Sequence, residues 1–128
     1  MATRIVLVDD DDSLAELLRV NFELDDRFVL LGRARNGAEG VELVAELQPD
    51  AVLMDLHMPV LGGIEATRRL VRADPEACVI AFTSSDDAGE LGAVREAGAT
   101  AVLAKPFDPQ FFLDAVAEHA RKCRLRAA

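Results

Sequence analysis

Apolar residues along the chain fall into short runs that alternate with stretches of helical periodicity. Short apolar runs predict strands, and they lie at 4–8, 28–34, 51–54, 78–82 and 101–104. The stretches between them place apolar side chains on one helical face, as Leu14, Leu18 and Phe22 do, which is typical of helices that cover a sheet. These stretches predict helices over 13–24, 37–47, 63–73, 87–97 and 108–123.

The regular alternation of strands and helices predicts the α/β class, with a doubly wound parallel sheet. Every run except 28–34 is nearly continuous in apolar residues, as in strands that are buried on both faces. The 128 residues suit one domain, with a core over 4–120 and a basic C-terminal tail over 121–128. Because such sheets carry their binding and catalytic sites beyond the carboxyl ends of the strands, we expect the functional residues just after each apolar run.

Charge and hydropathy limit which partners and which location the sequence is compatible with. With a net charge of −9, the domain is not expected to bind nucleic acid directly. The apolar residues form no long stretch, so no membrane span is expected. The first apolar run is too short for a secretory signal, which favours a cytoplasmic protein. Cations from Arg121 to Arg126 suit the end of a helix, and contact with an acidic partner is the alternative.

The two cysteines, Cys78 and Cys123, lie far apart in the sequence. Their spacing is not that of a metal site, and disulfides are rare in a reducing compartment. We therefore expect two free thiols, one buried as a small apolar residue and the other on the surface of a helix.

Acidic residues gather after two of the predicted strands. Asp9 to Asp12 follow the first strand, and Asp55 ends the third. Two carboxylates about 5 Å apart repel by roughly 3 kcal/mol at an effective dielectric of about 20, so their convergence calls for a cation. Oxygen ligands without a His or Cys cluster favour Mg²⁺, with Mn²⁺ as a substitute. We assign Asp9 and Asp10 to the metal, and we expect Asp11 and Asp12 to cap the helix that follows.

A hydroxyl and an ammonium follow the fourth and fifth strands at the same edge. Thr83 ends one apolar run, where strand-end hydrogen bonding alone would also explain it, and Lys105 follows the other. Together with a metal and the Asp55 carboxylate, these groups make up a phosphoryl site: a nucleophile, charge neutralisation and two contacts to phosphoryl oxygens.

Taken in order, these motifs resemble the receiver domain of two-component response regulators, over residues 4 to about 120. The resemblance is carried by LVDD at 7–10, MDLHMP at 54–59, Gly63, Thr83 and KPF at 105–107. The ordered set is specific, although each part alone is common.

The resemblance implies a flavodoxin-like fold, with five parallel strands in the order 2-1-3-4-5 and five helices. It also implies that Asp55 accepts a phosphoryl group from a sensor histidine kinase or a phosphotransfer protein. Asp10, Asp55 and the backbone carbonyl of His57 would bind Mg²⁺, with Asp9 acting through water.

The same resemblance implies that Thr83 and Lys105 hold the phosphoryl oxygens, and that the Lys105–Pro106 peptide bond is cis. The domain would then be a signalling phosphoacceptor, which catalyses only its own phosphotransfer and dephosphorylation. Its downstream partner would be a protein target or an output domain, and phosphorylation-dependent dimerisation through the fourth and fifth βα units is a further expectation.

One position departs from the family pattern, and the predicted fourth helix bears on its consequence. Family members often carry an aromatic residue three positions before the lysine, whereas this chain has Val102, so coupling from Thr83 must be weaker or rely on backbone shifts. Gly89 and Gly92 lie in the predicted fourth helix and cost about 1 kcal/mol each relative to Ala, which would make the helix easy to rearrange. Close packing is the alternative reason for these glycines.

His57 is expected to point towards the phosphoryl group and to tune hydrolysis of the acyl phosphate. The alternative is an exposed loop histidine with no role. Val102, Thr83 and His57 are thus the residues that we expect to modulate the switch.

Two rival functions stay open at this stage. Asp9-x-Asp11-x-Ser13 loosely resembles the nucleophile motif of haloacid dehalogenase phosphatases, which would make Asp9 the nucleophile but leave Asp55 unexplained. A pseudo-receiver would bind partners without phosphorylation, although such domains lose acidic or lysine positions that this chain retains.

Overall fold

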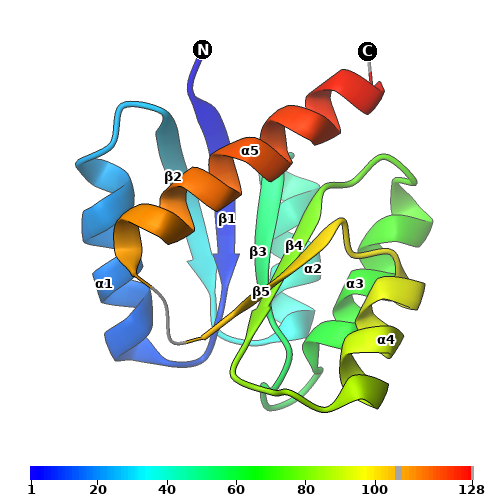
Figure 1. Ribbon diagram of the computed structural model, residues 1–128. Coiled ribbons are helices and arrows are strands. Elements are labelled where there is room, and N and C mark those ends of the chain that lie inside the picture. Colours follow the sequence, from blue (N-terminus) through cyan, green and yellow to red (C-terminus); the bar gives the residue numbers. More distant parts are fainter. Residues whose placement is uncertain (106–107, 128) are drawn as a thin grey trace.

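The computed structural model describes residues 1–105 and 108–127, which form a five-stranded parallel sheet with helices on both faces (Figure 1). The strands are β1 (Thr3–Val8), β2 (Phe28–Ala34), β3 (Ala51–Asp55), β4 (Val79–Thr83) and β5 (Ala101–Ala104). The helices are α1 (Asp12–Glu23), α2 (Gly37–Leu47), α3 (Gly63–Ala73), α4 (Ala88–Ala97) and α5 (Pro109–Ala127). The strand order β2-β1-β3-β4-β5 confirms the predicted doubly wound topology.

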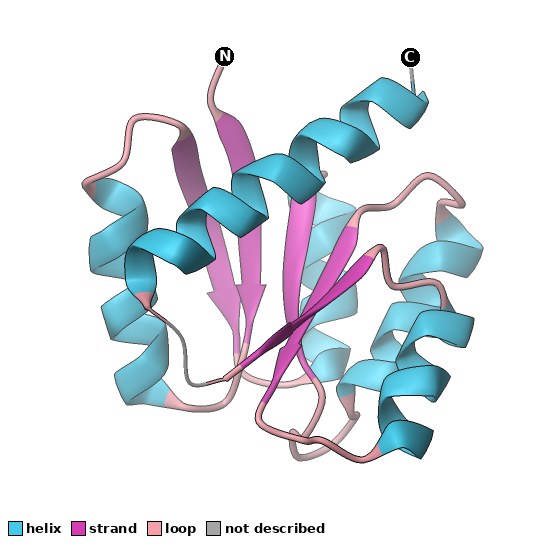
Figure 2. Ribbon diagram, in the orientation of Figure 1, coloured by secondary structure: helices cyan, strands magenta, loops and turns pink. Residues whose placement is uncertain are grey.

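The sheet has an apolar core on each face, because successive side chains of a strand point to opposite sides. On one face, Leu7 of β1 packs in a cluster with Phe22 of α1 and Phe112 of α5. On the other face, Val6 belongs to a cluster with Leu70 of α3. Helices α1 and α5 accordingly cover one face, and α2, α3 and α4 cover the other (Figure 2).

The strand register brings the ends of β1, β3 and β4 side by side. Val8 of β1 is paired with Met54 of β3, so the residues that follow them, Asp9 and Asp55, are neighbours. Asp55 in turn is paired with Phe82, the residue before the end of β4. All the candidate side chains therefore start from one edge of the sheet, opposite the two chain termini (Figure 2).

Helix α1 begins where an aspartate satisfies its first backbone donors. The Asp11 side chain accepts a hydrogen bond of 3.1 Å from the Leu14 N–H, which is the geometry of an N-cap. Asp12, also expected to cap, is instead the first helical residue, and its carboxylate pairs with Arg33 at 2.8 Å and with Arg35. Only Asp11 is the cap.

Helix α5 is longer than the sequence pattern predicts, and it continues past Cys123 to Ala127. The basic residues assigned to a tail are therefore helical as far as Ala127. Arg124 donates a hydrogen bond of 2.9 Å to Thr3 Oγ1, which ties the last turns of α5 to the start of β1. Neither α5 nor any other helix in the described parts of the chain is long and apolar enough to cross a membrane.

The expectation of two free thiols is wrong, because Cys78 and Cys123 form a disulfide. Cys78 directly precedes β4, and Cys123 faces it from α5, with their Cα atoms 6.0 Å apart. The prediction relied on compartment and on the separation of 45 residues in sequence. Sequence separation does not reveal that the end of α5 packs over the start of β4.

Helix α4 has few buried residues, since only Val94 and Ala97 are buried along its length. A Cβ added to Gly92 would meet nothing within 4 Å, and one added to Gly89 would approach only Asp87 Oδ1, at 3.0 Å. Close packing therefore does not account for Gly92. The two glycines leave α4 with low intrinsic helix propensity, as the sequence predicts.

Candidate functional site

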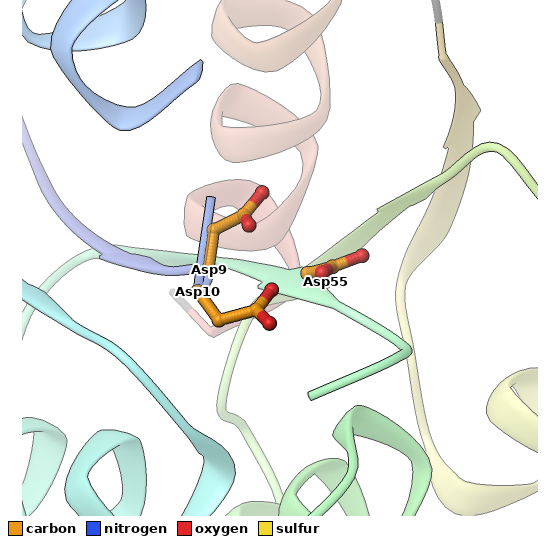
Figure 3. A group of neighbouring side chains, drawn as sticks. All are labelled: Asp9, Asp10 and Asp55. Carbon is orange, nitrogen blue, oxygen red and sulfur yellow. The ribbon is translucent and has the colours of Figure 1, made fainter. Parts of the chain in front are cut away.

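Three aspartates meet beyond the ends of β1 and β3 (Figure 3). One carboxylate oxygen from each of Asp9, Asp10 and Asp55 lies within 4.8 Å of the other two. Asp9 is fully buried and Asp55 is only 7% exposed, whereas Asp10 is open to solvent. The structure thus brings together the three carboxylates that the sequence predicts to converge.

Lys105 reaches the same pocket from the end of β5. Its Nζ lies 3.0 Å from Asp9 Oδ2 and 3.3 Å from Asp55 Oδ1. The ammonium also sits 4.4 Å from the centroid of the Phe82 ring, a cation–π contact that helps to fix it. Lys105 therefore places a cation beside the carboxylate that would carry a phosphoryl group. The predicted cis bond to Pro106 lies outside the described residues.

Asp9 is held more tightly than its neighbours. Its Oδ1 accepts a hydrogen bond of 2.8 Å from the Asp11 N–H, and its Oδ2 accepts one from Lys105. Its backbone carbonyl accepts a third, of 2.9 Å, from Arg33 Nε. Both carboxylate oxygens of Asp9 thus accept hydrogen bonds, and its action on the metal through water stays a prediction.

The donor chemistry of the pocket fits a hard divalent cation. The grouped ligand atoms are all carboxylate oxygens, the donors that Mg²⁺ prefers, and one of the three aspartates faces solvent. One ammonium does not neutralise three carboxylates, so the pocket keeps an excess of negative charge that a cation would relieve. Coordination by the His57 carbonyl stays a prediction.

Burial raises the pKa of the Asp55 carboxyl, and the nearby charge of Asp9 raises it further. The ammonium of Lys105 and the Leu56 N–H, 2.9 Å from Asp55 Oδ1, oppose this shift. A carboxylate with a raised pKa is more basic, and so a better nucleophile, than one in water. Asp55 combines this electrostatic environment with a place at the end of β3, beside Asp9 and Asp10 (Figure 3).

Thr83 supplies a buried hydroxyl on the strand next to Asp55. It is 2% exposed, and its position one residue past the Asp55–Phe82 pair puts it at the same edge of the sheet. Its Oγ1 accepts a hydrogen bond of 3.1 Å from the Ser85 N–H. The hydroxyl proton of Thr83 is thus left to donate to another group.

The loop after β3 is shaped by two close backbone contacts. The Gly63 N–H donates to the Leu56 carbonyl at 2.9 Å, and a Cβ at Gly63 would lie 1.9 Å from the Asp55 carbonyl oxygen. Leu61 N–H donates to the Pro59 carbonyl around Val60, whose φ of 68° is rare for a β-branched residue. A strained turn and a glycine therefore hold the backbone at the end of β3 in place.

The side chain of His57 does not take the direction that the sequence analysis expects. It is 64% exposed, and its Nε2 lies 2.8 Å from Oε2 of Glu90, in the first turn of α4. Sequence reasoning missed Glu90. A signal was present, because Asp87 and Glu90 have the spacing of a capping pair, and Asp87 Oδ1 accepts from the Glu90 N–H at 2.9 Å.

Val102 lies where family members often carry an aromatic residue, and it is partly buried. It packs against a small cluster made of Leu56, Ala81 and Val94, beneath α4. Its isopropyl group fills this space without a ring that could rotate. Weaker coupling from Thr83 and reliance on backbone shifts therefore both stay predictions for the switch.

A doubly wound sheet with an acidic pocket and a lysine at its carboxyl edge defines a receiver-type signalling domain. The chain also matches the family model described as response regulator receiver domain, over residues 5–117. The chain belongs to this family. Receiver domains are signalling phosphoacceptors of two-component systems, which bind Mg²⁺ at an acidic pocket and interact with histidine kinases and downstream targets.

Similar proteins differ in what surrounds the shared domain. The chemotaxis protein CheY of Halobacterium salinarum is 36% identical, over 92% of this chain and 97% of its own length. The transcriptional regulatory protein DegU of Brevibacillus brevis is 32% identical over 88% of this chain, which spans only 48% of DegU. A solved LuxR-family response regulator from Aurantimonas sp. has a TM-score of 0.88 and 32% identity, with 95% of this chain and 87% of that chain covered.

Proposed function

We propose that Asp55 is the phosphoacceptor of this receiver domain, and that its phosphorylation switches protein contacts through the fourth and fifth βα units, β4–α4 and β5–α5. The observation that supports the proposal is the position of the Asp55 carboxylate. It is nearly buried at the carboxyl edge of the sheet, grouped with Asp9 and Asp10, and 3.3 Å from the ammonium of Lys105.

The reaction is the transfer of a phosphoryl group from a histidine nitrogen to a carboxylate oxygen of Asp55. An Asp55 oxygen attacks the phosphorus of a phosphohistidine on a sensor kinase or phosphotransfer protein, forming a P–O bond as the P–N bond breaks. The electron pair of that bond stays on the imidazole nitrogen, which takes up a proton. Lys105 then balances the charge on the phosphoryl oxygens, and the Thr83 hydroxyl donates a hydrogen bond to one of them. Water later attacks the phosphorus, the bond from phosphorus to the Asp55 oxygen breaks, and inorganic phosphate leaves as the carboxylate is restored.

Asp10 and Asp55, with the His57 carbonyl, would hold Mg²⁺, and Asp9 would act through water. When bound, the metal supplies charge neutralisation for the carboxylates and the phosphoryl oxygens. The protein's own contribution is to fix Asp9 through Asp11 and Arg33, so that the acidic pocket keeps its shape without the ion.

A haloacid-dehalogenase-like phosphatase is the less favoured function. It requires Asp9 as the nucleophile, but Asp9 is fully buried and both of its carboxylate oxygens accept hydrogen bonds. Asp55 is better placed to meet a phosphoryl donor. We further propose a cytoplasmic location, where histidine kinases present their phosphohistidine. The downstream partner would be a protein target or an output domain.

Incubation with a small acyl phosphate or phosphoramidate and Mg²⁺, read by intact mass, tests the acceptor. Wild type should gain one phosphoryl group, whereas Asp55→Asn should gain none because the nucleophilic oxygen is gone. Chelation of Mg²⁺ should suppress the gain in wild type. Asp26→Asn is the matched control, since Asp26 is an exposed aspartate before β2, at the opposite end of the sheet.

Equal phosphorylation of Asp55→Asn and wild type would rule out Asp55 as the acceptor. Wild type that gains no phosphoryl group from either donor, and shows no thermal shift with beryllium trifluoride and Mg²⁺, would instead favour a pseudo-receiver. A phosphoryl gain that persists in the chelator would contradict the Mg²⁺ requirement but not the assignment of Asp55 as the acceptor.

Magnesium should also stabilise the fold, because it relieves repulsion among Asp9, Asp10 and Asp55. At ten times its Kd the ion adds about 1.4 kcal/mol, which is roughly 5 °C in Tm for a domain of this size. Asp10→Asn should show a smaller gain and, in chelator, a higher Tm than wild type, since one repelling charge has been removed. Thermal unfolding with and without Mg²⁺ measures both effects, with Asp26→Asn expected to follow wild type. A wild-type Tm that does not respond to Mg²⁺ would contradict the prediction.

A further inference from the structure

One carboxylate ties together the two loops that frame the acceptor. Glu90 Oε1 accepts a hydrogen bond of 2.8 Å from Ser85 Oγ, in the loop after β4. Its other oxygen, Oε2, lies 2.8 Å from Nε2 of His57, two residues past Asp55 in the loop after β3. Both loops are thereby fastened to the first turn of α4, and we call this three-residue contact the Glu90 clamp.

The clamp is connected to Thr83 by a short chain of hydrogen bonds. Ser85 N–H donates to Thr83 Oγ1 at 3.1 Å, and the Ser85 hydroxyl donates to Glu90. Asp87 N–H donates to Ser85 Oγ at 3.2 Å, and Asp87 caps α4 through the Glu90 N–H. Movement of Thr83 therefore pulls on Ser85, and through it on both Glu90 and the start of α4.

We propose that Glu90 is a positioning residue, which holds His57 and Ser85 in the unphosphorylated arrangement and is released when Asp55 is phosphorylated. The inference rests on the proposed function. A phosphoryl group on Asp55 would draw the Thr83 hydroxyl towards it and stretch the bond from Ser85 N–H. The Ser85 hydroxyl then loses its alignment with Glu90, and the clamp opens.

The first turn of helix α4 is expected to rearrange when the Glu90 clamp opens. Val94 and Ala97 are its only buried residues, and they lie in its second half, so its first turn depends on the Asp87 cap and the clamp. Gly89 and Gly92 lower the helix propensity of the same stretch. In a domain with Val102 in place of an aromatic residue, the clamp offers a route from Thr83 to the surface that needs no rotating ring.

The coupling is reciprocal, so weakening the clamp should favour the phosphorylated arrangement. Beryllium trifluoride with Mg²⁺ serves as the probe, because it mimics a phosphoryl group on an aspartate without turnover. Glu90→Ala and Ser85→Ala should each bind it about threefold to tenfold more tightly than wild type, as expected for the loss of one or two hydrogen bonds. Combining the two substitutions should add less than the sum of their effects, because both remove the same contact.

Two variants distinguish the effect of losing the clamp contacts from the effect of losing a negative charge. Ser85→Ala leaves the net charge unchanged, and Glu96→Gln removes one negative charge from an exposed position on the same helix. Glu96→Gln should bind the probe as wild type does, and Glu90→Gln, which keeps an acceptor for the Ser85 hydroxyl, should lie between wild type and Glu90→Ala. Tighter binding in Glu96→Gln, or no change in Ser85→Ala, would leave only an electrostatic effect and overturn the inference.

Amide hydrogen exchange in α4 provides a readout that does not need the probe. Glu90→Ala should exchange faster than wild type in the first turn of α4 without any ligand, and the probe should speed the same amides in wild type. If wild type binds the probe but neither exchange nor affinity changes in Glu90→Ala, the clamp is refuted and the proposed function stands. If wild type neither binds the probe nor accepts phosphate, the proposed function fails and this inference fails with it.

Discussion

Replacement of Gly63 by alanine should remove a large part of the free energy of unfolding. It should also disable Asp55 as the proposed phosphoacceptor. A Cβ at this position would lie 1.9 Å from the Asp55 carbonyl oxygen and 2.9 Å from Leu56 Cα. Both contacts are with backbone, so no side-chain rotation relieves them. The loop must move, and with it the last residue of β3. We expect a loss of about 3 kcal/mol or more in the free energy of unfolding.

Gly92→Ala is the matched control for this prediction. It adds the same methyl group to a helix, but a Cβ there meets nothing within 4 Å. Because Ala has the higher helix propensity, this variant should gain up to about 1 kcal/mol. Urea unfolding of both variants measures the contrast, and intact mass after treatment with a phosphoryl donor shows whether Gly63→Ala still accepts. Equal stability of the two variants would mean that the loop after β3 is not fixed by this contact.

The acidic pocket was predictable from sequence because parallel strands end at a common edge. Once the runs at 4–8 and 51–54 are read as parallel strands, and the strand order implied by the family resemblance makes them adjacent, Asp9 and Asp55 start from neighbouring positions, and the register confirms this. Lys105 follows by the same logic from the end of β5. The polarity of the residues after each run therefore carried most of the information about the site.

Contacts between side chains of different loops were not predictable in this way. The approach of His57 to Glu90 depends on the rotation of α4 about its axis and on the path of two irregular loops, which hydrophobic periodicity does not encode. The positive φ of Val60 is equally hidden, since β-branched residues are not the usual choice for that conformation. The disulfide depends on the packing of α5 over the start of β4, which the apolar pattern does not encode even though it places Cys123 on that helix.

The second large effect concerns that disulfide. Reduction of the bond between Cys78 and Cys123 should lower stability, because the cross-link restricts the unfolded chain over a sequence separation of 45 residues. The chain-entropy model gives about 4 kcal/mol for a loop of this length. For a domain of this size that corresponds to a fall in Tm of roughly 15 °C. Thermal unfolding of the same protein with and without reductant isolates the cross-link, since every packing contact of the sequence is otherwise retained.

The Cys123→Ala variant provides the control, because it cannot form the bond and its Tm should not respond to reductant. It should also unfold near the temperature of reduced wild type, apart from the small loss of a buried sulfur atom. Alkylation in denaturant, read by intact mass, reports the bond directly: oxidised wild type should take up no label until it is reduced. If unreduced wild type takes up two labels and its Tm ignores reductant, the two sulfurs are thiols packed together, and the junction of α5 with β4 is held by apolar contacts alone.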